Sequence, residues 1–261
     1  MMKNKKLAIC LIIFACLATI VVLSSAIFAL NSASVNFLET PQIMQGKEQQ
    51  IIESANFAYG SNVLFLGKKG YTQAIEKANP YIKVVNIETV FPNKFVIHCV
   101  ERQEVFAFQQ KNGTYAIIDE EFKVLKTQNE FLNTTTNAIL LTNLGEVDNY
   151  EEGDFISLND RQKSLVIATF HSLREWKTSY SELKNKVENV EIDYKRDNQV
   201  LIQIRNNVKI IVKDANICNS DKLNLAFSAY ESDTKFQSDI VMEVRQSEDN
   251  IIKIFYTKQG Q

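Results

Sequence analysis

An apolar run near the amino terminus is the feature that most constrains this chain. Residues 7–30 contain no charged side chain. They follow a cluster of three lysines, Lys3, Lys5 and Lys6. At about 1.5 Å per residue, a helix of this length measures about 36 Å, which is enough to cross a hydrocarbon core of roughly 30 Å. The run therefore predicts a single transmembrane helix.

The lysines also predict the orientation of that helix. Basic residues beside a span stay on the cytoplasmic side, and the next basic residue after the run is Lys47. We therefore expect residues 1–6 to form a short cytoplasmic tail and residues 31–261 to lie outside the cytoplasm. The alternative is a cleaved signal peptide, although its apolar region normally has only about 7 to 15 residues. Either interpretation exports the bulk of the chain.

The charge of the exported part excludes one class of function. The whole chain has a formal net charge of −2, and three of its lysines belong to the short tail. The exported part is therefore mildly acidic, whereas nucleic-acid binding needs a basic stripe that neutralises phosphates. We expect no nucleic-acid partner.

The cysteines do not require a disulfide framework. Cys10 and Cys16 lie in the apolar run, and only Cys99 and Cys218 lie outside it. A bridge between the latter two is chemically allowed in an oxidising compartment. Because both lie in apolar, strand-like sequence, we expect two buried free thiols instead.

The first hundred residues predict one small α+β module. Residues 34–38 alternate polar and apolar side chains, as a half-buried strand does. Apolar residues recur at helical spacing in residues 47–58 and 71–78. Residues 82–90 and 94–101 are rich in β-branched and aromatic residues, which favours a hairpin. The order βααββ predicts two helices on one face of a three-stranded sheet.

The rest of the chain predicts a mostly antiparallel β domain with two covering helices. One helix is expected at residues 161–177, capped by Asp160, and another from Ser220 to about Tyr230. Short apolar segments predict the strands, at residues 105–109, 115–118, 122–125, 138–141, 187–193, 200–204, 209–212, 240–244 and 251–256.

Several short motifs occur in a characteristic order behind the apolar run. These are Tyr59-Gly60-Ser61-Asn62-Val63-Leu64, Asn79-Pro80-Tyr81-Ile82-Lys83-Val84-Val85, Phe91-Pro92-Asn93-Lys94-Phe95-Val96-Ile97, Glu101-Arg102 with Val105-Phe106-Ala107, and Ala116-Ile117-Ile118-Asp119. With them the chain resembles the DivIB/FtsQ family of bacterial cell-division proteins. The resemblance implies five parts: a tail at 1–6, a span at 7–30, a POTRA domain at 31–102, a β domain at 103–246, and a carboxyl-terminal strand and tail at 247–261.

One departure from the family concerns the turn after Asp119. Family members usually have a glycine there, whereas this chain has Glu120, Glu121 and Phe122. The hairpin must therefore turn without the residue that most easily adopts a positive φ.

Candidate catalytic groups are few. His98 and Cys99 are adjacent on a predicted strand, so their side chains point to opposite faces. The order His171, Cys218, Arg245 is similar to that of the sortase transpeptidases, but the threonine-rich strand motif of that family is missing before Cys218. The histidines and cysteines have no recognisable metal-ligand spacing. We expect no catalytic residue, no metal site and no cofactor.

The carboxyl terminus offers a better candidate site. Residues 250–256 combine high β propensity with little charge and no proline. An exposed strand of this kind leaves main-chain groups on which another chain can add a strand. The resemblance implies that this edge binds small coiled-coil division proteins of the FtsB/DivIC and FtsL types. The interface residues that it implies are Arg245, Ile252, Ile254, Phe255 and Tyr256.

These observations predict a non-enzymatic, single-span scaffold at the division septum. The resemblance also implies contact with the septal peptidoglycan synthase. Two alternatives remain open: a membrane-anchored, sortase-like cysteine transpeptidase, and a POTRA-bearing protein that chaperones exported polypeptides.

Overall fold

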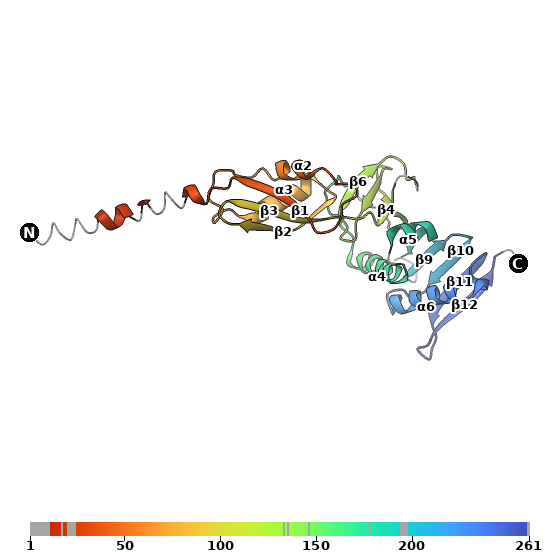
Figure 1. The fold of residues 1–261 in the computed structure, drawn as a ribbon. Helices are drawn as coiled ribbons and strands as arrows, with labels where there is room; N and C mark the ends of the chain where they lie inside the picture. The colour runs from red at the N-terminus through yellow and green to blue at the C-terminus, as the bar shows by residue number, and fades with distance from the viewer. Residues whose placement is uncertain are drawn as a thin grey trace, which may run out of the picture. The chain divides into compact units, whose positions relative to one another are not determined.

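The computed structural model divides the chain into two compact units, Met1–Arg102 and Gln103–Gln261 (Figure 1). The structure describes residues 11–16, 18–19, 25–132, 134, 136–145, 147–177, 179–193 and 198–259.

The expected tail at residues 1–6 lies outside the described residues, as do several positions of the expected span at 7–30. Within the residues that are described, none of the helices has both the length and the apolar character needed to cross a membrane.

The first unit has the expected βααββ order (Figure 1). Its strands and helices are β1 (Ser32–Phe37), α2 (Glu48–Ser54), α3 (Lys68–Ala78), β2 (Ile82–Val90) and β3 (Lys94–Glu101). β3 is the central strand, parallel to β1 and antiparallel to β2. Ile51 of α2 and Ile75 of α3 belong to the same buried cluster as Phe95 and Ile97 of β3. The helices therefore bury their apolar stripes on the central strand.

Two charged residues at the end of β3 stabilise loops inside this unit. Oε2 of Glu101 accepts hydrogen bonds from the main-chain N–H groups of residues 42–44, at 2.8 to 3.0 Å. The guanidinium of Arg102 lies 3.5 Å from Glu76, and its Nε donates to the carbonyl of Ile82. The carboxylate thus satisfies three donors that the loop after β1 leaves without a strand partner.

Cys99 lies on β3 and is a free, buried thiol, as expected. Burial raises its pKa to about 11, with a smaller contribution from the carboxylate of Glu48. The thiolate is therefore scarce at neutral pH, and Cys99 is a packing residue rather than a nucleophile.

In its described residues the second unit forms one nine-stranded sheet. The strand order is β12-β11-β10-β9-β8-β7-β4-β5-β6. The strands are β4 (Phe106–Gln109), β5 (Tyr115–Ile118), β6 (Val124–Gln128), β7 (Ile139–Thr142), β8 (Val187–Asp193), β9 (Gln199–Ile204), β10 (Val208–Val212), β11 (Ile240–Gln246) and β12 (Ile252–Lys258). The pairs β4–β7, β7–β8 and β10–β11 are parallel, and the other neighbours are antiparallel. The expected α+β class is confirmed.

The helices of this unit correct the sequence prediction. Its described residues contain three α-helices rather than two, namely α4 (Asp160–Trp176), α5 (Tyr180–Lys186) and α6 (Asn219–Ser232), with a short 3₁₀ helix η1 at Thr234–Phe236. The cap of α4 is Asn159 and not Asp160. Its side chain accepts from the N–H of Gln162, whose own side chain accepts from the N–H of Asn159. These two reciprocal hydrogen bonds form a capping box, which satisfies N–H donors that the first turn of the helix leaves unpaired.

Cys218 also differs from the prediction. It is free but exposed, and it immediately precedes α6 with a φ of 51°. The apolar residues around it belong to a turn and a helix start, not to a strand.

Candidate functional site: the open edge of the second sheet

β12 forms one end of the nine-stranded sheet. Along its whole length it pairs antiparallel with β11, from Ile252 opposite Gln246 to Lys258 opposite Ile240. Among the described residues no strand pairs with its other side. β12 is therefore an open edge strand.

Two hydrogen bonds show which main-chain groups of β12 face outward. Beyond one end of the ladder the N–H of Ser247 donates to the carbonyl of Ile251, and beyond the other end the N–H of Gln259 donates to that of Asp239. In an antiparallel pair, hydrogen-bonded and non-hydrogen-bonded residues alternate. Both bonds show that the main-chain N–H and C=O groups of the odd-numbered residues of this strand point toward β11. The N–H and C=O groups that point away from β11 are those of Ile252, Ile254, Tyr256 and Lys258.

The side chains of β12 alternate as expected. Ile252 and Ile254 are half-buried against the main core, and the ring of Tyr256 meets Phe236 edge-on at 5.2 Å. Side chains of the other set are exposed, including Phe255 at 44%. Of the residues that offer main-chain groups outward, Ile252 and Ile254 thus hold the strand onto the core by their side chains, whereas Tyr256 is 54% exposed.

Arg245 and Phe255 form a contact on the other face of the sheet. The guanidinium carbon of Arg245 lies 4.2 Å from the centre of the Phe255 ring, and a guanidinium nitrogen lies 3.8 Å from Glu243. The structure thus places the five residues expected at the interface on two adjacent strands, β11 and β12, with side chains on both faces.

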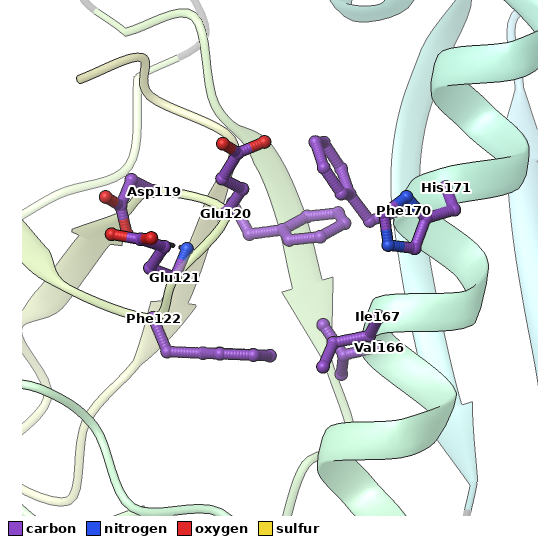
Figure 2. Close-up of a pocket in the computed structure, with 9 residues that line it drawn as sticks. Asp119, Glu120, Glu121, Phe122, Val166, Ile167, Phe170 and His171 are labelled. Carbon is purple, nitrogen blue, oxygen red and sulfur yellow. Dashed lines mark hydrogen bonds between the residues drawn. The ribbon is translucent and has the colours of Figure 1, made fainter. Parts of the chain in front are cut away.

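A pocket of about 290 Å³ lies elsewhere in the same unit (Figure 2). Figure 2 shows residues 119–122 on one wall and Val166, Ile167, Phe170 and His171 of α4 on the other. Its lining is mostly apolar, and Asp119, Glu120 and Glu121 of the turn also contribute to it. Sequence reasoning did not identify this pocket, because its two walls are far apart along the chain.

The turn that forms one wall explains how the chain replaces the usual glycine. Oδ1 of Asp119 accepts hydrogen bonds from the N–H groups of Glu121 and Lys123, at 2.9 and 2.8 Å. Phe122 adopts a φ of 65°, which a bulky residue takes only when its surroundings impose it. Its ring is 6% exposed and belongs to the main core. The buried ring and the Asp119 carboxylate together stabilise this turn.

The sortase-like residues occupy three different environments. His171 is on α4 at the pocket, Cys218 precedes α6, and Arg245 is on β11 against Phe255. The guanidinium is thus engaged by an aromatic ring and a carboxylate, and not by a thiol. The contacts of these residues give no support to a nucleophile with a flanking base.

Comparisons with known proteins match part of the first unit to a domain family and identify a relative of the chain. Residues 44–102 match the family described as the POTRA domain, FtsQ-type. The chain is 27% identical over 195 residues to a protein of Clostridium tetani (strain Massachusetts / E88) named "Cell division protein DivIB". That alignment covers 75% of this chain and 69% of the relative. Together the βααββ unit and these two matches confirm the resemblance of this chain to the DivIB/FtsQ family of bacterial cell-division proteins.

Proposed function

We propose that this protein is a non-enzymatic scaffold of the bacterial division apparatus, held in the membrane by one span with its bulk outside the cytoplasm. Its partners are small coiled-coil division proteins of the FtsB/DivIC and FtsL types, and through them it is linked to septal peptidoglycan synthesis. The family resemblance supports the process, and the open edge of β12 supports the mode of binding.

The observation that carries this proposal is the outward row of main-chain groups on β12. In an extended strand, outward pairs recur every second residue, so a partner segment of about six residues can form a regular ladder with them. Main-chain hydrogen bonds then provide affinity, while side chains on both faces provide specificity. Phe255 on one face and Tyr256 on the other are large β12 side chains that lie next to such a partner, while Arg245, one strand further in, supports the ring of Phe255.

The decisive experiment removes an outward donor without removing an inward one. Proline at an edge position whose N–H faces solvent is tolerated within a sheet. Tyr256→Pro therefore deletes one outward N–H and obstructs an incoming strand. Tyr256→Val is the matched control, since it also loses the ring but keeps the donor.

Affinity is measured for the full chain against a coiled-coil partner of the FtsB/DivIC type, by calorimetry or by co-purification. We expect Tyr256→Pro to bind at least about tenfold more weakly than Tyr256→Val, since loss of a main-chain bond and a steric block exceed about 1.4 kcal/mol together. Equal affinity of the two variants would exclude strand addition at this edge.

A further inference from the structure

One end of the POTRA sheet brings together three segments that are distant in sequence. The N–H of Leu30 donates to the carbonyl of Ser61, and the N–H of Val63 donates to that of Phe28, at 2.8 and 2.9 Å. The N–H of Asn31 donates to the carbonyl of Asn93 at 2.9 Å. We call this end, made of residues 27–31, 59–69 and 90–94, the aromatic end.

The aromatic end exposes an unusual set of large apolar side chains. Phe65 is 85% exposed and Phe91 62%, and Ile27, Leu64 and Tyr59 are each more than half exposed. Phe28 meets the ring of Phe91 edge-on at 6.0 Å. Apolar side chains gathered in this way on a folded domain mark a contact surface rather than scattered surface residues.

The charged residues of the aromatic end all have one sign. Its three segments contain Lys68, Lys69 and Lys94, and they contain no aspartate or glutamate. This contrasts with a chain whose formal net charge is −2. Lysines beside exposed aromatic and aliphatic side chains are the pattern of a surface that rests on an anionic bilayer.

The opposite end of the same sheet has a different character. β1 and β3 are parallel, with Ser32 opposite Lys94 and Phe37 opposite Cys99, so the far end lies about 20 Å away. That end carries Glu101, whose carboxylate holds the loop at residues 42–44. The far end therefore mixes charges of both signs, with Lys83 and Arg102 beside Glu101, whereas the three segments of the aromatic end carry lysines alone.

We propose that the aromatic end is a membrane-docking surface, with Phe65, Leu64 and Phe91 in the interfacial layer of an anionic bilayer and the lysines at its headgroups. A bilayer is the partner that chain continuity favours, because the apolar run ends at Leu30 and the N–H of Leu30 is hydrogen-bonded directly to Ser61 of this end. The inference rests on the membrane span of the proposed function, but not on the β12 edge. Docking would fix the POTRA domain on its anchor instead of leaving it tethered by a free hinge.

The test places a tryptophan at each end of the sheet in the full chain. Phe65→Trp reports on the aromatic end, and Ile43→Trp is the control, since Ile43 is an exposed apolar residue beside Glu101 at the far end. The variants are reconstituted in vesicles of phosphatidylglycerol and phosphatidylcholine with brominated acyl chains. The emission of Trp176, the single natural tryptophan, is measured in the unsubstituted chain and subtracted.

We expect bromine to quench the added emission of the Phe65→Trp chain at least threefold more strongly than that of the Ile43→Trp chain. A second arm tests charge: Lys69→Glu in the Phe65→Trp chain should reduce quenching, whereas Lys47→Glu, which changes an exposed lysine near the far end, should not. Equal quenching at both ends would overturn the docking surface and leave the scaffold proposal intact. A chain that alkaline carbonate removes from the vesicles would overturn the docking surface and the membrane span, while binding at β12 would stand or fall in the partner assay alone.

Discussion

The two edge strands of the nine-stranded sheet differ in whether other segments of the chain cover their outer main-chain groups. At β6 the N–H of Val124 donates to the carbonyl of Asp154, and its carbonyl accepts from the N–H of Gly153, both at 2.8 Å. Further along β6 the carboxylate of Glu152 accepts from the N–H of Thr127. At β12 no segment of the described chain pairs with the outward groups.

This contrast shows that the fold is able to cover an edge and that it does so at one side only. An uncovered edge is a liability for aggregation, and proteins normally blunt it with loops, charges or bulges. β6 is blunted by the segment around residues 152–156. β12 is an edge of seven residues with Ile252 and Ile254 packed on the core, and it is the edge at which we propose that a partner adds a strand.

The largest expected effect comes from placing proline on each edge in turn. Val124→Pro removes a donor that the fold uses and disturbs a side chain with 0% exposure, so it should lower the free energy of unfolding by about 3 kcal/mol. Tyr256→Pro removes a donor that faces solvent and the edge-on contact with Phe236, which costs about 1 kcal/mol. Urea unfolding monitored by circular dichroism measures both. Equal losses at the two positions would mean that β12 is covered like β6.

A smaller effect on the free energy of unfolding is expected from Glu152, whose carboxylate covers a main-chain N–H of β6. Glu152→Ala should expose the N–H of Thr127 and cost about 0.5 to 1 kcal/mol, because the bond is charge-assisted but solvent-exposed. Glu151→Ala is the matched control, since that exposed neighbour contributes its main-chain N–H, which alanine retains, to the turn. A Glu152 variant as stable as the control would show that the main-chain bonds of residues 153–154 protect the edge without help.

The smallest effect concerns the helix that supports the open half of the sheet. α6 packs against β10 and β11, and its Glu231 accepts hydrogen bonds from Trp176 and Lys186 and lies 3.0 Å from Lys177. Burial raises the pKa of Glu231, but hydrogen bonds from Lys177 and Lys186 outweigh burial and hold the pKa below its ordinary value of 4.5.

A depressed carboxylate pKa contributes stability above the unfolded-state value and loses it as the pH falls through the folded-state value. Glu231→Gln should therefore lose less stability than the unsubstituted chain as the pH is lowered below about 4.5. Because the side chain is 41% exposed, the difference should stay below about 1 kcal/mol. Thermal unfolding measured from pH 6 to pH 3 checks it, and parallel curves would contradict the role of this carboxylate.

Local sequence patterns predict the POTRA strands well and one helix of the second unit not at all. The bounds of β2 and β3 are those expected, because dense β-branched residues flank a turn that contains Pro92. α5 escapes prediction because Leu183 is its one buried residue, and one apolar position shows no period. The sheet order is equally hidden, since its parallel pairs join strands that are far apart in sequence.

The candidate site is predictable in place but not in detail. Composition and position indicate an edge at residues 250–256. Which of its main-chain groups face outward depends on the register with β11, and that register is fixed by the turn at residues 247–251. A shift of one residue would reverse both the outward groups and the buried face, so the site's chemistry follows from the pairing rather than from the segment itself.

Amide hydrogen exchange of β12, resolved by residue and recorded with and without a coiled-coil partner, tests the central claim most directly. In the free chain, the amides of Lys253, Phe255 and Thr257 should be protected, and those of Ile252, Ile254, Tyr256 and Lys258 should exchange rapidly. The partner should slow the second set at least about tenfold while leaving Val124 and Thr127 of β6 unchanged. Continued rapid exchange of the even-numbered amides in a saturated complex would contradict strand addition at this edge.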